Sequence, residues 1–500
     1  MNKTLKALVT LVVTSTLVLG TMAGCSSKKQ DPNTEGKKSE PVTLKIMLPG
    51  DRPKDWDAVK AEAEKRMEST INVKLDVSFA PWTDIDQKSK VAMTSGEEWD
   101  LVWDAPDWPH YQEMALGGYY EPIDDLLKQF GPNILKNRSK EMMEANKIEG
   151  KSYGVPLEIR YYKPWGFYVR KDLREKYGME PLKTWEDLVA FMTKVKETEK
   201  NVIPFVPHNG TDFVPFKLTA VQNPDMNLNV LYGTALYAKN NDGKVYNFLD
   251  DPDPKVMKQL QQTRKLVQDG IISKDTMILT NDEFGKGKTA VTIANDIGVR
   301  DNVKTSLASA IPGATAEFVS LDDTSKQLYS TFKAGNFICV PVSSKKKESA
   351  IKFLDWANEK DNYDLLAYGI KGQDWEEGTE NTYKVLPTNQ YATFGYAWIW
   401  NPSLDRLNSD LEPQVLKFDE YTRDSKNFKE DKLTGFTFNP KAVKNEIAQY
   451  NKMNLEMWRP ILGGVLDYDT NMPKFKEKAY PILKKIQVEY QKQIDEFLKK

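Results

Sequence analysis

The stretch VTLKIMLPGD (residues 42–51) decides the fold of the first part of the chain. Apolar and polar side chains alternate along it, which is typical of a β-strand with one buried face, and Pro49 and Gly50 end the alternation. Two more strands are predicted at residues 72–79 and 100–103, with helices between the strands at residues 57–67 and 85–94. This alternation of strands and helices predicts an α/β lobe with a mainly parallel sheet.

The predicted strand ends carry aromatic and acidic side chains. In parallel sheets, ligands bind beyond the carboxyl ends of the strands. The candidates at these ends are Asp51, Trp82, Trp103, Asp104 and Trp108. Planar rings can stack on the apolar face of a sugar while carboxylates accept hydrogen bonds from its hydroxyl groups, so these residues predict a carbohydrate site.

Other polar loops combine the same residue types. The chain has 12 Trp, and several of them lie in loops rich in Pro and Asp, which is unusual for a side chain that prefers burial. The further candidates for ligand contact are Glu158, Arg160, Tyr161, Trp165, His208, Asn295, Asp296, Tyr396, Trp398 and Trp400. For any one of these Trp residues, packing in the core is an equally good interpretation.

The N-terminus predicts export and lipid anchoring. Lys3 and Lys6 are followed by an apolar run too short to span a membrane, which indicates a signal peptide over residues 1–24. The ending Ala-Gly-Cys resembles a bacterial lipobox, although Met22 replaces the usual Leu, so Cys25 is the expected lipid acceptor. An ordinary secretory signal with a chance cysteine is the alternative. Residues 25–40 have no large apolar side chain and are expected to form a flexible tether.

Composition limits the classes of function. Loss of Lys3 and Lys6 with the signal peptide changes the formal net charge from −2 to about −4, which gives no reason to expect nucleic acid. About 475 residues remain, more than one ordinary core holds, so two lobes are expected. Cys339 lies in the apolar strand pattern FICV and is predicted to be an inert buried thiol, without a disulfide if Cys25 is acylated.

Motifs for catalysis or cofactors are weak. The segment GKGKT (residues 285–289) lacks the first Gly of a phosphate loop, because position 282 is Asp. Only two His are present, with no metal-ligand spacing and no nucleophile elbow around a Ser, so no metal and no cofactor are predicted. Adjacent pairs such as Asp322-Asp323 are expected to be turn residues, although abundant carboxylates leave a two-carboxylate glycosidase open.

Two helices in the second half have clear signals. Thr184 and Asp187 form a capping-box pattern that predicts a helix running to Lys196. From Lys474 onward, apolar residues recur at steps of three and four, which predicts an amphipathic helix docked on the protein's own core rather than on a partner.

Several segments resemble a known family. YYEPIDDLL (residues 119–127), YVRKDL (residues 168–173), FGKGKTAV (residues 284–291) and NFICVPVSSKKKESAIKFLDWA (residues 336–357) are similar to segments of bacterial extracellular solute-binding proteins of the carbohydrate type. The ending, with GFTFNP at residues 435–440, resembles the LipO-like lipoproteins. In this family, the segment at residues 284–291 takes no part in nucleotide binding.

The resemblance implies a two-lobe periplasmic-binding-protein-like (type II) α/β fold with a hinge and a cleft between the lobes. The first lobe is expected to hold residues 41–157 and 325–385, and the second residues 158–324 and 386–500. Some relatives carry a calcium loop in the second lobe, but residues 197–204 lack its spacing.

By resemblance, the protein is a non-catalytic monomer on the extracellular face of the cell membrane. It is expected to bind an oligosaccharide in the cleft and to deliver it to an ABC permease, whose ATPase is a separate subunit. Three alternatives stay open: an exported glycoside hydrolase or lyase, a peptide-binding protein and a sensor lipoprotein.

Overall fold

The computed structural model describes residues 40–499, except residues 107–109, 159, 208–213, 276–278, 280–281, 296, 380 and 392–397. The chain divides into two compact units, Met1–Glu40 and Pro41–Lys500, and all helices and strands described belong to the second unit. The predicted signal peptide, Cys25 and the tether up to residue 39 lie outside the described residues. None of the helices in the described part combines the length and the apolar character that a membrane span needs.

A five-stranded sheet follows the predicted pattern of the first lobe. Its strands lie in the order β2-β1-β3-β13-β4. Their bounds are Val42–Pro49 (β1), Val73–Ala80 (β2), Leu101–Asp104 (β3), Gly154–Leu157 (β4) and Asn336–Cys339 (β13). The strands β1, β2 and β3 are parallel as predicted, whereas β13 is antiparallel to both β3 and β4, so the complete sheet is mixed.

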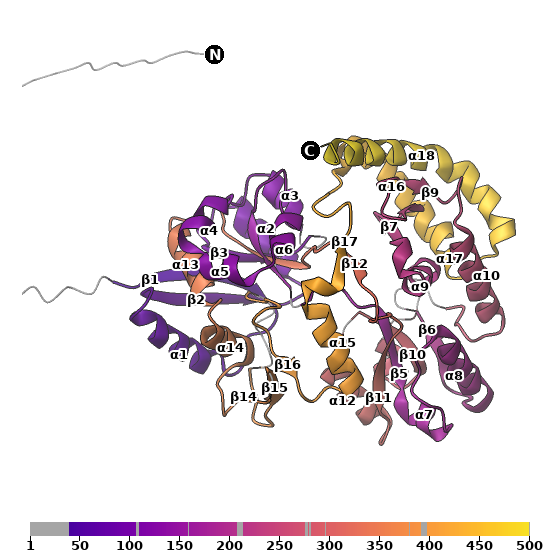
Figure 1. The fold of residues 1–500 in the computed structure, drawn as a ribbon, viewed down its shortest axis with the longest axis horizontal. Coiled ribbons are helices and arrows are strands. Elements are labelled where there is room, and N and C mark those ends of the chain that lie inside the picture. Colours follow the sequence, from indigo (N-terminus) through magenta and orange to yellow (C-terminus); the bar gives the residue numbers. More distant parts are fainter. Residues whose placement is uncertain are drawn as a thin grey trace, which may run out of the picture. The chain divides into compact units, whose positions relative to one another are not determined.

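Helices cover both faces of this sheet. They are α1 (Trp56–Glu68), α2 (Ile85–Thr94), α3 (Tyr111–Leu116), α4 (Asp124–Phe130), α5 (Pro132–Asn137), α6 (Lys140–Ala145), α13 (Lys347–Trp356) and α14 (Lys360–Tyr368). Figure 1 shows α1 and α14 on one side of the sheet and α2, α4 and α13 on the other. Leu44, Ile46 and Leu48 of β1 are completely buried, because they lie on the same face of the strand and this face is covered.

The first core extends past its predicted boundary at residue 385. Tyr391, Trp398, Ile399 and Leu404 are buried in the same cluster as the apolar residues of β1 and β3. Three short strands lie around this boundary: β14 (Trp375–Glu377) and β15 (Thr382–Val385) precede it, and β16 (Leu407–Asn408) follows it. The buried residues between 391 and 404 therefore pack in the core of the first sheet, although the second lobe was expected to begin at residue 386.

A second, four-stranded sheet has the order β11-β5-β10-β6. Its strands are β5 (Gly166–Arg170), β6 (Ile203–Val206), β10 (Thr289–Ala294) and β11 (Ala316–Ser320). The helices near it are α7 (Lys171–Lys176), α8 (Trp185–Thr198), α11 (Asp282–Gly285), α12 (Asp301–Ala310) and α15 (Pro413–Arg423). The predicted capping box of α8 is confirmed, since the Asp187 N–H donates to Thr184 Oγ1 (3.1 Å) and the Thr184 N–H to Asp187 Oδ2 (2.9 Å).

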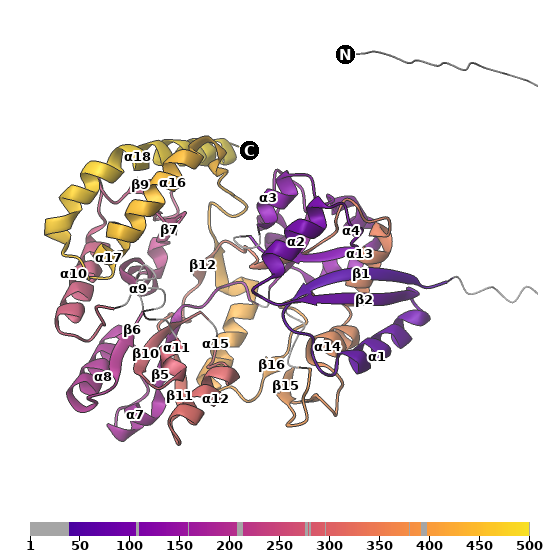
Figure 2. The same cartoon turned by 180° about the vertical axis from the view of Figure 1, so that it is seen from behind.

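A third, mostly helical core joins residues 214–268 with the C-terminal region. It combines α9 (Val214–Gln222), α10 (Pro254–Gln268), α16 (Lys444–Met453), α17 (Arg459–Leu462) and α18 (Tyr468–Phe497) with the small sheet β7 (Asn229–Leu231), β8 (Leu236–Ala238) and β9 (Tyr246–Asn247). Figure 2 shows α18 lying along α16. Phe475, Leu483 and Ile486 of α18 are completely buried, which confirms the predicted amphipathic helix docked on its own core.

The chain passes repeatedly between the two large sheets. Residues 158–165 join β4 to β5, and residues 321–335 join β11 to β13. The second connection contains β12 (Leu328–Ser330), which pairs in parallel with β17 (Phe428–Glu430). Cys339 lies at the end of β13 and is completely buried, as predicted, and burial raises the pKa of its thiol well above the ordinary value.

Candidate ligand-binding site

One edge of the second sheet brings distant segments together. Gly166 at the start of β5 lies opposite Ala294 at the end of β10 and opposite Ser320 at the end of β11. Trp165 directly precedes Gly166, Asn295 directly follows Ala294, and Asp322 lies two residues after Ser320. All three therefore lie at the same edge of the sheet. This edge includes the carboxyl ends of β6 and β10, which are parallel.

A cavity of about 760 Å³ lies at this edge. Its walls come from the two connections between the sheets and from α9 and β7, and its lining residues include Arg160, Tyr161, Tyr162, Lys163, Trp165, Lys217, Asn229, Asp322, Tyr329, Thr331 and Lys333. Three of the predicted ligand-contact residues, Arg160, Tyr161 and Trp165, are therefore brought together here. The volume is typical of a site for a small organic ligand.

Aromatic rings form part of the cavity wall. Trp165 is 3% exposed and packs edge-on against Phe167, with 5.0 Å between ring centroids, so most of this indole belongs to the core. Tyr162 and Tyr329 are half-buried and present more surface. The sequence interpretation missed Tyr329, because no motif in the sequence marks the connecting strand on which it lies.

Asp322 supplies a carboxylate beside the rings. The Tyr162 hydroxyl donates to Asp322 Oδ1 (2.8 Å), and the Ser320 hydroxyl donates to Oδ2 (3.2 Å). Desolvation raises the pKa of Asp322 to about 6, while these hydrogen bonds and the charge of Lys217 oppose part of the rise. The sequence predicted a turn residue here, because nothing local shows that β11 ends at the edge of a cavity.

Arg160 is held by an ion-pair chain behind the cavity wall. Its Nε donates to Asp419 Oδ1 of α15 at 2.6 Å, and Arg423 Nη2 lies 2.9 Å from Asp419 Oδ2. Burial alone would raise the pKa of Asp419, but the two guanidinium groups hold it below its ordinary value. Arg423 also pairs with Asp405, so it joins two buried carboxylates.

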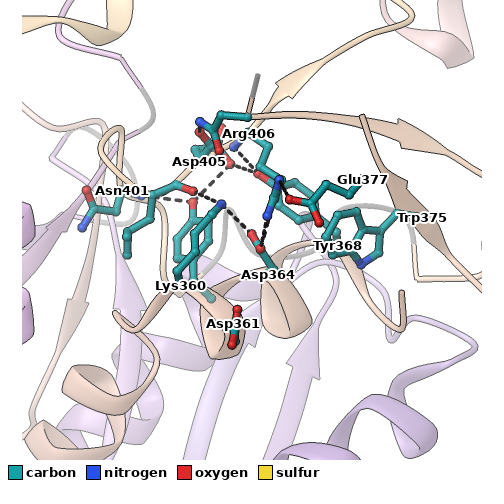
Figure 3. A network of polar contacts seen from close by, with 12 residues as sticks. Lys360, Asp361, Asp364, Tyr368, Trp375, Glu377, Asn401, Asp405 and Arg406 are labelled. Carbon is teal, nitrogen blue, oxygen red and sulfur yellow. Dashed lines mark hydrogen bonds and ion pairs between the residues drawn. The ribbon is translucent and has the colours of Figure 1, made fainter. Parts of the chain in front are cut away.

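This chain of contacts continues to α14, one of the helices that cover the first sheet. Asp405 accepts hydrogen bonds from the hydroxyl groups of Tyr363 (3.2 Å) and Tyr368, as part of the network drawn in Figure 3. Arg406 donates from Nη2 to Asp364 (2.8 Å) and from Nη1 to Glu377 (2.9 Å). Polar contacts therefore link Arg160 of the cavity wall to α15 and, through Asp405, to α14.

Trp103, Asp104 and Trp398, which the sequence predicted as ligand contacts, are buried. Trp103 and Trp398 are 2% and 1% exposed, and Trp398 packs between Trp56 and Phe353 with ring centroids 5.5 and 5.7 Å away. Asp104 is 1% exposed and accepts hydrogen bonds from the Tyr120 hydroxyl (2.6 Å) and the Ala105 N–H (2.7 Å). These side chains form part of the core in this structure, so their contact with a ligand stays a prediction.

The remaining predicted residues are dispersed. Trp82 is 43% exposed and lies edge-on against Trp103, so its role in binding stays a prediction. Asp51 and Asn295 are exposed, Trp400 is half-buried, and Glu158 accepts from the Gly335 N–H at 3.3 Å. The predictions for Trp108, His208, Asp296 and Tyr396 lie outside the described residues.

The other sequence motifs are ordinary surface structure. Lys286 and Lys288 of GKGKT both pair with Glu283, at 2.8 and 3.2 Å, in the turn that leads into β10. Among the residues that the structure describes, no three His, Cys, Asp or Glu side chains are grouped as metal ligands. Residues 197–204 form the end of α8 and the start of β6.

The structure has two large sheets that are flanked by helices and joined by connecting segments, with a cavity at the edge of one sheet. This architecture is that of a binding protein. A family model described as bacterial extracellular solute-binding protein matches residues 58–372, so the chain belongs to that family. A second model, described as a domain of unknown function, matches residues 432–499, which include α16, α17 and α18.

Individual relatives agree with this assignment. A carbohydrate ABC transporter substrate-binding protein of Streptococcus pneumoniae is 26% identical over 96% of this chain and 94% of its own length. Lipoprotein LipO of Bacillus subtilis is 23% identical over 71% of each chain. The crystal structure of the N-glycan transport solute binding protein NgtS from Streptococcus pneumoniae has a TM-score of 0.75 at 23% identity, covering 92% of this chain and 99% of that one. The predicted fold class is thereby confirmed.

Proposed function

We propose that this protein is a lipid-anchored, extracellular substrate-binding protein of an ABC importer that captures an oligosaccharide in the 760 Å³ cavity. The observation that carries the proposal is the composition of the cavity wall. The half-buried rings of Tyr162 and Tyr329 offer stacking surface, while Asn229, Asp322 and Thr331 offer hydrogen-bonding groups. Sugars need both, because they have an apolar face and a polar rim.

The names of similar proteins support a sugar as the ligand. The relative from Streptococcus pneumoniae that spans nearly the whole chain is described as a carbohydrate ABC transporter substrate-binding protein. NgtS is also known in complex with Man1GlcNAc, in a structure with a TM-score of 0.67 to this chain. The chain therefore shares a family and a fold with proteins that are named for sugars.

The remaining parts of the proposal concern location and partners. Cys25 carries the lipid, residues 26–40 are the tether, and the folded body works as a monomer that hands its ligand to permease subunits. The proposed protein is not an enzyme, so it returns its ligand chemically unchanged. A binding protein and a glycosidase differ in this outcome, which one assay can measure.

The test is a panel of neutral and acidic oligosaccharides, monitored by the thermal unfolding of the purified protein and by chromatography of the sugars. The proposal predicts that at least one sugar raises the unfolding temperature, since a ligand that binds only the folded state stabilises it. It also predicts that every sugar is recovered intact. Sugar cleavage at low protein concentration would support the hydrolase alternative, and no thermal shift with any sugar would contradict the proposed function.

A further inference from the structure

The cavity wall has an excess of positive charge, although the whole chain has a formal net charge of −2. Four cations line it, namely Arg160, Lys163, Lys217 and Lys333, against the single carboxylate of Asp322. Surface lysines are common, so the excess alone indicates little. The surroundings of each cation show which of them is available to a ligand.

Three of these cations differ from the fourth in their surroundings. Arg160 pairs with Asp419 at 2.6 Å, so its charge is balanced within the protein. Lys163 and Lys217 are exposed, so water solvates their ammonium groups.

Lys333 has a different environment. Its Nζ donates to the neutral Thr437 hydroxyl at 2.7 Å, and no carboxylate of the described residues lies within ion-pair distance of it. The side chain is half-buried, and desolvation lowers the pKa of its ammonium group to about 8. Removing a charge from water without an opposite charge nearby is unfavourable, so the position of this ammonium calls for another explanation.

The backbone on both sides of Lys333 is fixed. The Asn146 amide donates to the Phe332 carbonyl (3.0 Å), and the Ala334 N–H donates to Asn146 Oδ1 (2.9 Å). Asn146 is itself buried, at 7% exposure. One buried amide thus fixes the backbone on both sides of Lys333, at the point where this residue lines the cavity.

We propose that the cavity selects an acidic oligosaccharide and that a carboxylate of this sugar pairs with the Lys333 ammonium, with the Thr437 hydroxyl beside it. This inference rests on the proposed function and narrows its ligand class. A carboxylate would supply the missing opposite charge and a charge-assisted hydrogen bond, which is stronger than a bond between neutral groups. A neutral sugar would leave the ammonium unpaired.

The first test compares matched sugars on the wild-type protein by isothermal titration calorimetry. The pairs are oligogalacturonate with its carboxyl-reduced form, glucuronate-substituted xylo-oligosaccharide with the unsubstituted chain, and 3′-sialyllactose with lactose. We expect at least one acidic member to bind at least tenfold more tightly than its neutral partner. If neutral sugars bind and no acidic member exceeds its partner, the inference is wrong while the proposed function stands. If no sugar of the panel binds, both fail.

The second test assigns the preference to one side chain. Lys333→Met keeps the length of the side chain and removes its charge, and should weaken the preferred acidic sugar at least tenfold. Lys333→Arg keeps the charge and should retain most of the affinity. Lys265→Met makes the same substitution at an exposed lysine of α10 and should leave the affinity unchanged. Equal affinity of wild type and Lys333→Met, with both folded by thermal unfolding, would overturn the assignment.

Discussion

Tyr329 is a single residue of the cavity wall whose role can be tested directly. Its ring is half-buried, with Lys429 Nζ 5.5 Å from the ring centroid. Tyr329→Ala should weaken sugar binding by about 1–3 kcal/mol, by analogy with the stacking of bases on aromatic side chains, whereas Tyr329→Phe should keep most of the affinity. Calorimetric titration gives both values.

Tyr246 provides a matched control for Tyr329. It is also half-buried and has a lysine near its ring, Lys239 at 4.7 Å, but it lies on β9, outside the cavity wall. Tyr246→Ala should leave sugar affinity unchanged. An equal loss of affinity in both alanine variants would show that the effect is not local to the cavity.

Asp104 should make folding stability depend on pH. Desolvation raises the pKa of its carboxyl group from 3.8 to about 7. The folded state therefore holds this proton more tightly than the unfolded state, and stability is lost as the pH rises from about 4 through about 7. Relative to Asp104→Asn, the free energy of unfolding of the wild type should fall by roughly 3–4 kcal/mol over that range.

Urea unfolding at several pH values measures this difference. Ser78→Ala, at an exposed position of neighbouring β2 without a titrating group, is the control and should show no comparable pH dependence relative to wild type. A difference between wild type and Asp104→Asn that stays constant from pH 4 to pH 8 would contradict the raised pKa.

The residue types alone could not show that the Trp82 side chain is exposed and the Trp103 side chain buried. Trp82 follows one predicted strand and Trp103 ends another, and each has an Asp within two residues, yet one is 43% exposed and the other 2%. Their burial is decided by the rings that pack against them, such as the edge-on contact between the two. Long-range packing of this kind leaves no local pattern in the sequence.

At the scale of elements, α15 depends on Arg423. This guanidinium lies between the buried carboxylates of Asp405 and Asp419, so Arg423→Met would leave two negative charges without their shared partner. Breaking a buried ion pair on one side typically costs 3–5 kcal/mol, and we expect a loss of about that size in urea unfolding. The control Arg52→Met breaks the exposed pair with Asp57 and should cost less than about 1 kcal/mol.

The C-terminal helix α18 offers a comparison between two of its faces. Ile486 is completely buried, whereas Val488, two residues later, is 59% exposed. Ile486→Ala should lower the free energy of unfolding by about 2–5 kcal/mol, because it leaves a cavity in the core. Val488→Ala should change it by no more than about 0.5 kcal/mol. Similar losses at both positions would contradict the packing of this helix.

Local patterns predicted these elements well because their causes are local. The capping box at Thr184 and Asp187 involves residues three apart, and the apolar spacing of α18 defines one helix face. The packing of residues 391–404 in the first core was not predicted, for the opposite reason. Tyr391 and Trp398 join the first core through contacts with residues far away in the sequence, such as Trp56.

At the scale of the whole molecule, the candidate site needs the complete fold. Its wall combines residues 160–165, 216–233 and 322–333, which meet only when both connections between the sheets have formed. The sequence predicted the first of these segments from its aromatic and charged residues. The other two have no motif, and their place is fixed by the register of β5, β10 and β11.

Lipid anchoring is a property of the complete chain. If Cys25 carries a diacylglycerol, the wild type should incorporate a labelled fatty acid and sediment with membranes when expressed in a Gram-positive host. Cys25→Ser should lose the label and leave the membrane fraction, whereas Cys339→Ser should retain both properties. A Cys25→Ser variant that is still labelled would refute the predicted anchor.

The most direct test of sugar capture in the cavity is a calorimetric titration of one sugar, the tightest ligand of the panel, into three proteins. Thr331→Trp adds a large side chain to the cavity wall, and Thr193→Trp makes the same change in a separate groove beside α8. We predict one saturable site in the wild type, unchanged binding in Thr193→Trp and a loss of at least tenfold in Thr331→Trp. Wild-type affinity in Thr331→Trp would place the sugar elsewhere and contradict the account.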